Sequence, residues 1–158
     1  MKITPFRATL FIRAFALRYI PALAFCRPSV VDLSASRSEV KIALSRRTKN
    51  HVGGMYIGVL ATGADCAGGM LAMQIVRERD MPVVPLFKDM QADFLKRPDG
   101  DVHFVCEDGD AIKAGVEQAM QSGERVNLPV TVVAAVPSIG PEPVARFKMM
   151  LSLKKKKA

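Results

Sequence analysis

The segment from Met55 to Arg79 constrains the fold of this chain more than any other stretch. It is rich in Ala, Gly, Met and Leu, and Asp65 is its only charged residue before Arg77. A helix that is apolar on nearly every side is buried, so we expect this segment to form a helix at the centre of the protein. Each glycine costs a helix about 1 kcal/mol relative to alanine, which predicts that neighbouring parts of the chain come close to it.

A strand pattern precedes this helix. Between Val30 and Arg46, a turn near Arg37 and Ser38 separates two runs in which apolar and polar residues alternate. The apolar positions are Val31, Leu33 and Ala35 in the first run and Val40, Ile42 and Leu44 in the second. This periodicity predicts two antiparallel strands, each with one face toward the core.

Further strands are expected after the central helix, at 83–96, 102–106, 126–136 and 144–153. The turn residues at 98–100 suggest that the first two of them pair as a hairpin. A helix is expected from Asp110 to Gln121, with Asp108 or Asp110 as its cap and Gly123 at its end. In a chain of 158 residues, this order predicts one α+β domain in which an antiparallel sheet curls around the central helix.

The N-terminal segment, residues 1–26, is expected to form a helix. Arg7, Arg13 and Arg18 break the apolar run that a signal peptide or a membrane-spanning helix needs. One face of the helix collects apolar residues, namely Phe6, Leu10, Ala14 and Leu17. We expect that face to pack on the core, and attachment to a membrane surface is the alternative.

The formal net charge is +8, which attracts anionic partners without choosing among them. Four lysines fall in the segment 154–158, which we expect to be a solvated tail. No recognisable nucleic-acid motif accompanies the charge, so we expect no nucleic-acid partner. Cys26, Cys66 and Cys106 have neither a disulfide pattern nor zinc spacing, which predicts a cytoplasmic protein without a metal site.

Residues 50–65, NHVGGMYIGVLATGAD, resemble the loop-helix motif of hotdog-fold acyl-CoA thioesterases of the phenylacetate-degradation (PaaI-like) branch. That motif reads roughly N-x-x-G-x-x-H-G-G, followed by small apolar residues and an acid on the helix. Asn50, Gly53, Gly58 and Asp65 fall in register with it, and the stretch 94–101 is also similar to one found in the superfamily. The resemblance implies a single hotdog domain over residues 1–158 that assembles as a dimer or a dimer of dimers.

The sequence departs from that motif at two positions. Tyr56 stands where the motif has histidine, and Ile57 stands where it has the following glycine. A tyrosine can donate a hydrogen bond to a thioester, but it is not a general base near neutral pH. His51 lies nearby in sequence and is a candidate to replace the histidine, although it can equally be an ordinary loop residue.

Thioester hydrolysis places negative charge on the carbonyl oxygen, and the free N–H groups at a helix N-terminus can stabilise it. Gly58 is therefore a candidate for the oxyanion contact. Asp65 is a candidate to deprotonate a water or to attack the carbonyl itself, and a purely structural acid is the alternative. Asn50 is a candidate for substrate contact or for a helix cap.

The resemblance implies hydrolysis of an acyl-CoA or a related acyl thioester at a dimer interface, with no cofactor besides the coenzyme A moiety of the substrate. A protein of the same fold that binds the thioester without cleaving it is the alternative. Four cations are candidates to hold the phosphates of coenzyme A. They are Arg77, Arg79, Lys96 and Arg97.

Overall fold

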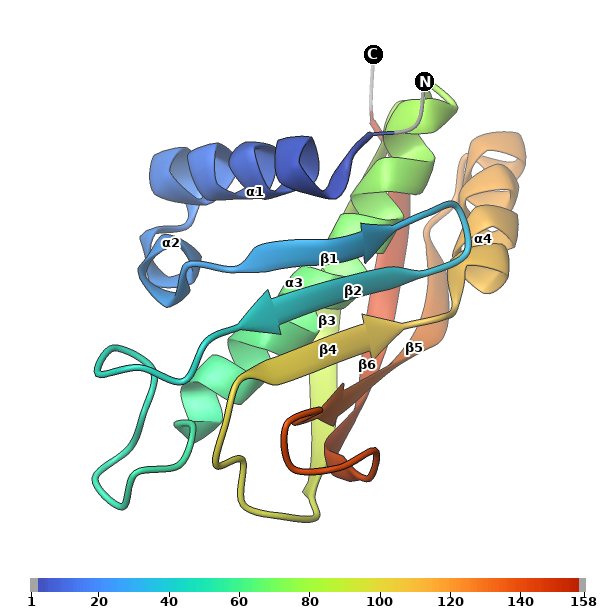
Figure 1. The fold of residues 1–158 in the computed structure, drawn as a ribbon. Helices are drawn as coiled ribbons and strands as arrows, with labels where there is room; N and C mark the ends of the chain where they lie inside the picture. The colour runs from blue at the N-terminus through green and yellow to red at the C-terminus, as the bar shows by residue number, and fades with distance from the viewer. Residues whose placement is uncertain (1–2, 157–158) are drawn as a thin grey trace.

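The computed structural model describes residues 3–156, which form four helices and one six-stranded antiparallel sheet (Figure 1). The helices are α1 (Pro5–Tyr19), α2 (Pro21–Cys26), α3 (Ile57–Glu78) and α4 (Gly109–Ser122). The strands are β1 (Ser29–Leu33), β2 (Ser38–Ile42), β3 (Val83–Phe94), β4 (Val102–Cys106), β5 (Val126–Ala135) and β6 (Pro143–Lys155). Their order in the sheet is β1-β2-β4-β5-β6-β3.

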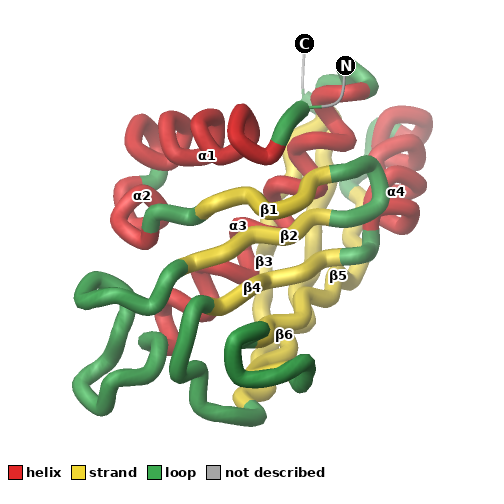
Figure 2. The backbone as a smooth tube through the Cα atoms, viewed as in Figure 1, coloured by secondary structure: helices red, strands yellow, loops and turns green. Residues whose placement is uncertain are grey.

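The sheet curves around α3, so that strands from both halves of the sheet lie against this helix (Figure 2). Residues along α3 are buried together with large side chains from the sheet, among them Phe104 and Phe147. The α+β fold class and the central buried helix are therefore confirmed. By length and composition α3 could also span a membrane, but most of it is buried inside the fold, as in the core helix of a soluble domain.

Two glycines of α3 make room for aromatic rings from the sheet. A Cβ atom on Gly63 would lie 2.3 Å from the ring of Phe104 on β4. A Cβ atom on Gly68 would lie 2.8 Å from the ring of Phe87 on β3. Close packing thus explains the glycines at positions 63 and 68, and in both cases the group that packs against the helix is an aromatic ring.

The predicted hairpin between the third and fourth strands is wrong. β3 pairs with β6, from Val83 opposite Lys155 to Phe94 opposite Ala145, and β4 pairs with β2 and β5. The reason is length, because the five residues of β4 could satisfy only part of the twelve-residue β3. β6 is long enough to pair with β3 along nearly all of it.

The predicted inward face of the first strand is also wrong. Val30 is buried, whereas Val31 is exposed at a bulge between Val30 and Asp32 that shifts the register against β2. Ala35 is exposed because β1 ends at Leu33. In β2 the alternation holds for Val40 and Ile42, which are both fully buried.

The N-terminal segment forms two helices, since α1 ends at Tyr19 and α2 begins at Pro21. The face of α1 that was expected to pack on the core points outward instead. Ala8, Ile12 and Ala16 are the buried positions, and the small side chains of Ala8 and Ala16 let α1 lie close to the sheet edge. There the hydroxyl of Thr9 accepts a hydrogen bond of 2.8 Å from the N–H of Val30.

The predicted boundary of the basic tail needs correction, because β6 continues to Lys155. Lys154 and Lys155 pair with Val84 and Val83, and the N–H of Lys156 donates to Pro82 at 2.7 Å. Pairing with the start of β3 holds these lysines in the sheet. The last two positions of the predicted tail, 157–158, lie outside the described residues.

The fourth helix was predicted with its ends in place. Asp108 occupies the N-cap position, although its carboxylate accepts a hydrogen bond from the N–H of Thr131 at 2.6 Å and does not cap the helix. Gly123 ends the helix in the left-handed conformation, with φ of 70°.

Gly63→Ala should lower the free energy of unfolding by about 1–3 kcal/mol, because the added methyl group collides with the Phe104 ring. Gly140→Ala is the control, since among the described residues a Cβ atom there meets nothing within 4 Å. It should change stability by no more than about 1 kcal/mol, because the added methyl group lies in open space. Urea unfolding followed by circular dichroism measures both variants, and equal stabilities would contradict this account of the packing.

Candidate functional site

One face of α3 is only partly covered by the rest of residues 3–156. Gly58, Thr62, Asp65 and Gly69 follow one another at the spacing of a single helical face. Asp65 is exposed, and nothing lies within 4 Å of a Cβ placed on Gly69. The open face of α3, as we call these four residues, is therefore a strip of small residues with one acid in it.

Asp65 lies at the surface of the single subunit, although the helix that carries it is largely buried, as expected. The atoms crowded around it nevertheless remove water from the carboxylate, and this desolvation raises its pKa above the ordinary value. Within residues 3–156 the Asp65 carboxylate makes no hydrogen bond or salt bridge. Asp65 is thus a carboxylate with a raised proton affinity and free access from outside.

The first turn of α3 holds the two other candidates on this helix. Tyr56 is the N-cap residue, with its side chain 53% exposed. Its ring lies over Gly58, where a Cβ would come within 2.5 Å of it. In the described part of the chain the N–H groups of Ile57 and Gly58 donate to no acceptor. Gly58 therefore gives the Tyr56 ring room beside two free N–H groups.

Asn50 and His51 lie outside the helix, in the turn that precedes it. The Asn50 side chain accepts a hydrogen bond of 3.0 Å from the N–H of Val52, and its backbone N–H donates to Gly54. This arrangement stabilises the turn and does not cap α3. His51 is exposed in the same turn and makes no hydrogen bond within the described residues. The structure thus brings Tyr56, Gly58 and Asp65 together on one helix and leaves these two residues in the loop.

Thr62 is a member of the open face that the motif comparison missed. Its hydroxyl donates a hydrogen bond of 2.8 Å to the carbonyl of Gly58, one turn earlier. Its position four residues after Gly58 and three before Asp65 was the available signal, because such spacing places all three on one face.

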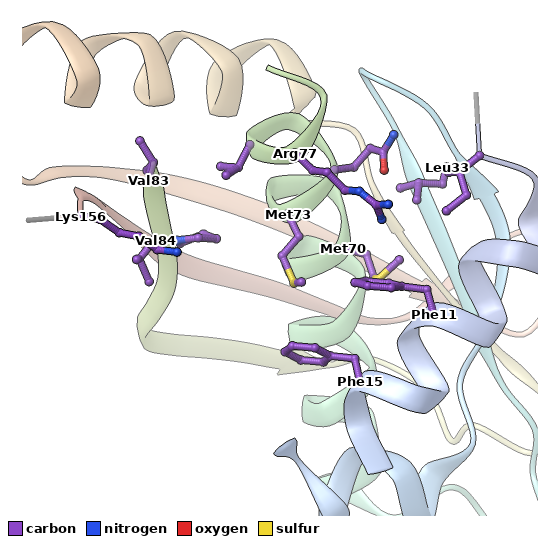
Figure 3. A pocket seen from close by; sticks show the side chains of 13 residues that line it. Phe11, Phe15, Leu33, Met70, Met73, Arg77, Val83, Val84 and Lys156 are labelled. Carbon is purple, nitrogen blue, oxygen red and sulfur yellow. The ribbon is translucent and has the colours of Figure 1, made fainter. Parts of the chain in front are cut away.

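An apolar cavity of about 440 Å³ lies beside the C-terminal half of α3. Figure 3 shows Met70 and Met73 of α3 opposite Phe11 and Phe15 of α1. Methionine side chains adapt to flexible apolar ligands. Met70 and Met73 line this cavity, and Met70 is itself buried.

The four cations proposed for coenzyme A differ in what they contact. Arg79 is paired with Glu117, Lys96 with Glu142, and Arg97 with Asp99. Arg97 also donates to the carbonyl of Val52. Arg77 instead lies over the Phe11 ring, with 5.5 Å from its guanidinium carbon to the ring centroid, and lines the cavity together with Lys156. Arg77 is therefore the one of the four without a carboxylate partner within residues 3–156.

The cysteines and His103 are structural. Desolvation by burial raises the pKa of the Cys66 thiol to about 12 and that of Cys106 to about 11, so neither is a nucleophile at neutral pH. His103 lies 2.7 Å from a carboxylate oxygen of Glu39, which Arg37 also contacts at 2.7 Å. Burial acts to raise the Glu39 pKa, but these two partners together lower it.

Comparison with known proteins gives a family and a fold. The family described as "Domain of unknown function (DUF4442)" matches residues 7–148. No curated protein matches the chain.

Several solved structures share its architecture. A protein of unknown function from Chlorobaculum tepidum TLS superimposes with a TM-score of 0.83 at 12% identity, over 97% of this chain and 98% of that one. A Pseudomonas aeruginosa protein described as a probable thioesterase gives 0.78 at 20% identity, over 94% and 96%. A thioesterase from Haemophilus influenzae gives 0.68 at 10% identity, over 98% and 93%. These likenesses confirm the hotdog fold.

Asp65→Asn should raise the free energy of unfolding at neutral pH. The folded state binds the Asp65 proton more tightly than the unfolded chain does, so stability is lost as the pH rises from the ordinary aspartate pKa of 3.8 through the raised pKa of the folded state. Asparagine stays neutral, and the advantage of the variant should shrink as the pH falls toward that value. Urea unfolding over a pH series measures this, and a variant less stable than wild type at neutral pH would contradict it.

Proposed function

This chain belongs to the DUF4442 family, and we propose that it hydrolyses an acyl-CoA or a related acyl thioester at a site between two copies of the chain. The observation that carries the proposal is Asp65, a carboxylate of raised pKa on the open face of α3. The thioesterase names among proteins of the same fold support the reaction class.

A second copy is needed because Gly58 and Asp65 of one subunit are too far apart to contact the same carbonyl group. Gly58 and Asp65 are seven residues apart, so they lie about 10 Å from each other along the helix axis. One thioester carbonyl cannot contact the N–H of Gly58 and the carboxylate of Asp65 in the same subunit. If a second α3 lies antiparallel on the open face, Gly58 of that copy comes opposite Asp65 of this one. The small residues Gly58, Thr62 and Gly69 allow the two helices to approach.

The edge strand β3 supports the same assembly. It pairs with β6 on one side only, and its other edge carries the free N–H and C=O groups of a twelve-residue strand. Val84, Leu86, Met90 and Phe94 are exposed along it. A long apolar edge of this kind is a template for pairing with another strand, and two β3 strands side by side would continue the sheet across the dimer.

The reaction follows from these positions. Asp65 takes a proton from a water, and the water oxygen attacks the thioester carbonyl carbon. The N–H groups at the start of α3 in the second copy stabilise the oxyanion. The C–S bond then breaks, the thiolate takes the proton that Asp65 removed from water and leaves as the free thiol, and the acyl group leaves as the carboxylic acid. A raised pKa suits this role, because it makes the carboxylate a stronger base. Direct attack by Asp65, followed by hydrolysis of the anhydride, is the variant of the same reaction.

The apolar cavity is suited to the acyl chain. Met73 lies two turns beyond Asp65 on α3, so a chain that extends from a carbonyl at Asp65 along the helix reaches the cavity. Arg77 and Lys156 at the cavity add an attraction for an anionic thioester.

The second candidate is a protein that binds the thioester without cleaving it, and Tyr56 favours it. This residue replaces the histidine of the motif, and its ring lies beside the free N–H groups over Gly58. Acyl-CoA that raises the melting temperature with no release of thiol would identify this function.

Asp65→Asn should lower the rate of thiol release from an acyl-CoA panel by at least about 100-fold, because general-base catalysis of this size is lost. A thiol-reactive dye measures the release. Asp110→Asn, which changes an exposed acid on α4, is the matched control and should keep wild-type activity. Full activity in Asp65→Asn would remove the basis of the proposal.

Gly69→Lys should convert the assembly to single subunits and abolish hydrolysis. A Cβ on Gly69 has no neighbour within the subunit, so the fold tolerates the side chain while a second helix cannot. Gly140→Lys is the control, because a Cβ there also meets nothing within 4 Å. Analytical ultracentrifugation measures the mass. If Gly69→Lys keeps the mass and activity of wild type, the site does not lie between two α3 helices.

A further inference from the structure

Helix α1 has three faces with different surroundings. Ala8, Ile12 and Ala16 are buried against the fold. Phe11 and Phe15 line the apolar cavity, as Figure 3 shows. The third face carries Phe6, Leu10, Ala14 and Leu17, which we call the outer stripe. At about 100° per residue these four positions fall within an arc of about 80°.

The outer stripe is apolar and exposed. Phe6 is 71% exposed, Leu10 54% and Leu17 75%. The core and the cavity already use the other two faces of α1, so the stripe contributes nothing to packing in the subunit. Three large apolar side chains in one line on an otherwise ordered helix indicate a surface that meets an apolar phase.

The charges beside the stripe are all positive. Arg7 and Arg18 flank it on one side and Arg13 on the other. Arg13 is held there, because its guanidinium donates to the Pro28 carbonyl at 2.9 Å and to Ser29 at 2.8 Å. The chain has no Asp or Glu before Asp32. The positive field around the stripe is therefore not neutralised by any acid of its own segment.

We propose that α1 docks on an anionic lipid bilayer through the outer stripe. A helix that lies in the plane of a membrane buries its apolar side chains at the boundary of headgroups and acyl chains, and flanking arginines contact the anionic headgroups. Apolar residues on the outward side between arginines fit this arrangement. A second copy of the chain fits less well, because stripe against stripe would bring the arginines of both copies together.

Docking also places the cavity at the membrane. Phe11 and Phe15 are carried by the same helix as Leu10 and Leu17, so the wall of the cavity and the lipid-facing surface are two sides of α1. The proposal does not depend on the proposed hydrolysis, since it rests on residues outside the open face of α3.

Cosedimentation with vesicles tests the docking. The full chain should sediment with vesicles of phosphatidylglycerol and phosphatidylcholine in roughly equal parts, weakly with phosphatidylcholine alone, and less as the salt concentration rises. A triple variant Phe6→Ser, Leu10→Ser, Leu17→Ser should lose at least about tenfold in vesicle affinity. Ile139→Ser with Val52→Ser removes exposed apolar side chains elsewhere and should bind as wild type.

A second pair of variants tests the charge separately. Arg7→Glu with Arg18→Glu should lose binding to the anionic vesicles, while Lys113→Glu with Lys148→Glu, which changes net charge equally at exposed positions on α4 and β6, should lose much less. Circular dichroism checks folding and light scattering checks mass. Wild-type protein that stays in the supernatant, or a triple variant that binds equally well, would overturn the proposal. So would a triple variant that changes only the oligomeric state, because the stripe would then face a second copy.

Discussion

Close packing between α3 and the inside of the sheet is the constraint on which the rest of the structure depends. Gly63 and Gly68 leave space for the rings of Phe104 and Phe87, and so the sheet can curl tightly around one helix. Larger residues at these positions would push β4 and β3 away from the helix. The glycines lower the helix propensity of α3, and the apolar surface that is buried between α3 and the sheet compensates for this loss of stability.

The close packing of the sheet on α3 also determines which side chains of this helix remain accessible from outside. The sheet covers most of α3 but leaves a strip in which Gly58, Thr62, Asp65 and Gly69 follow one another. Asp65 would be expensive to enclose alone, and at the surface it keeps access to water while its surroundings still raise its pKa. The beginning of the same helix supplies free N–H groups in line with the acid. The acid and the free N–H groups therefore lie on one helix, and under the proposed function the edge of β3 would align a second copy.

Much of this architecture could be predicted from local patterns. The buried helix followed from its lack of charge, and the long strands at 126–136 and 144–153 followed from their periodicity. The pairing of β3 with β6 could not be predicted, because it depends on the matching of lengths across the sheet. The bulge at Val30 could not be predicted, and neither could the orientation of α1, because its buried face includes the small residues Ala8 and Ala16 whereas Phe6, Leu10 and Leu17 are exposed. At the site, the spacing of Gly58 and Asp65 indicates that they share one side of the helix. The exposure of Asp65 and the position of the Tyr56 ring could not be predicted, because they depend on how the rest of the chain packs around α3.

The three cysteine thiols of the protein are unreactive, and this matters for assays that measure the release of a thiol. Each thiol is buried, and the pKa of each is raised by desolvation. Such thiols hold their protons at neutral pH and react slowly with electrophiles and oxidants. A dye that reports free sulfhydryl groups therefore reacts slowly with the folded protein itself and reports mainly the thiol that is released from a substrate.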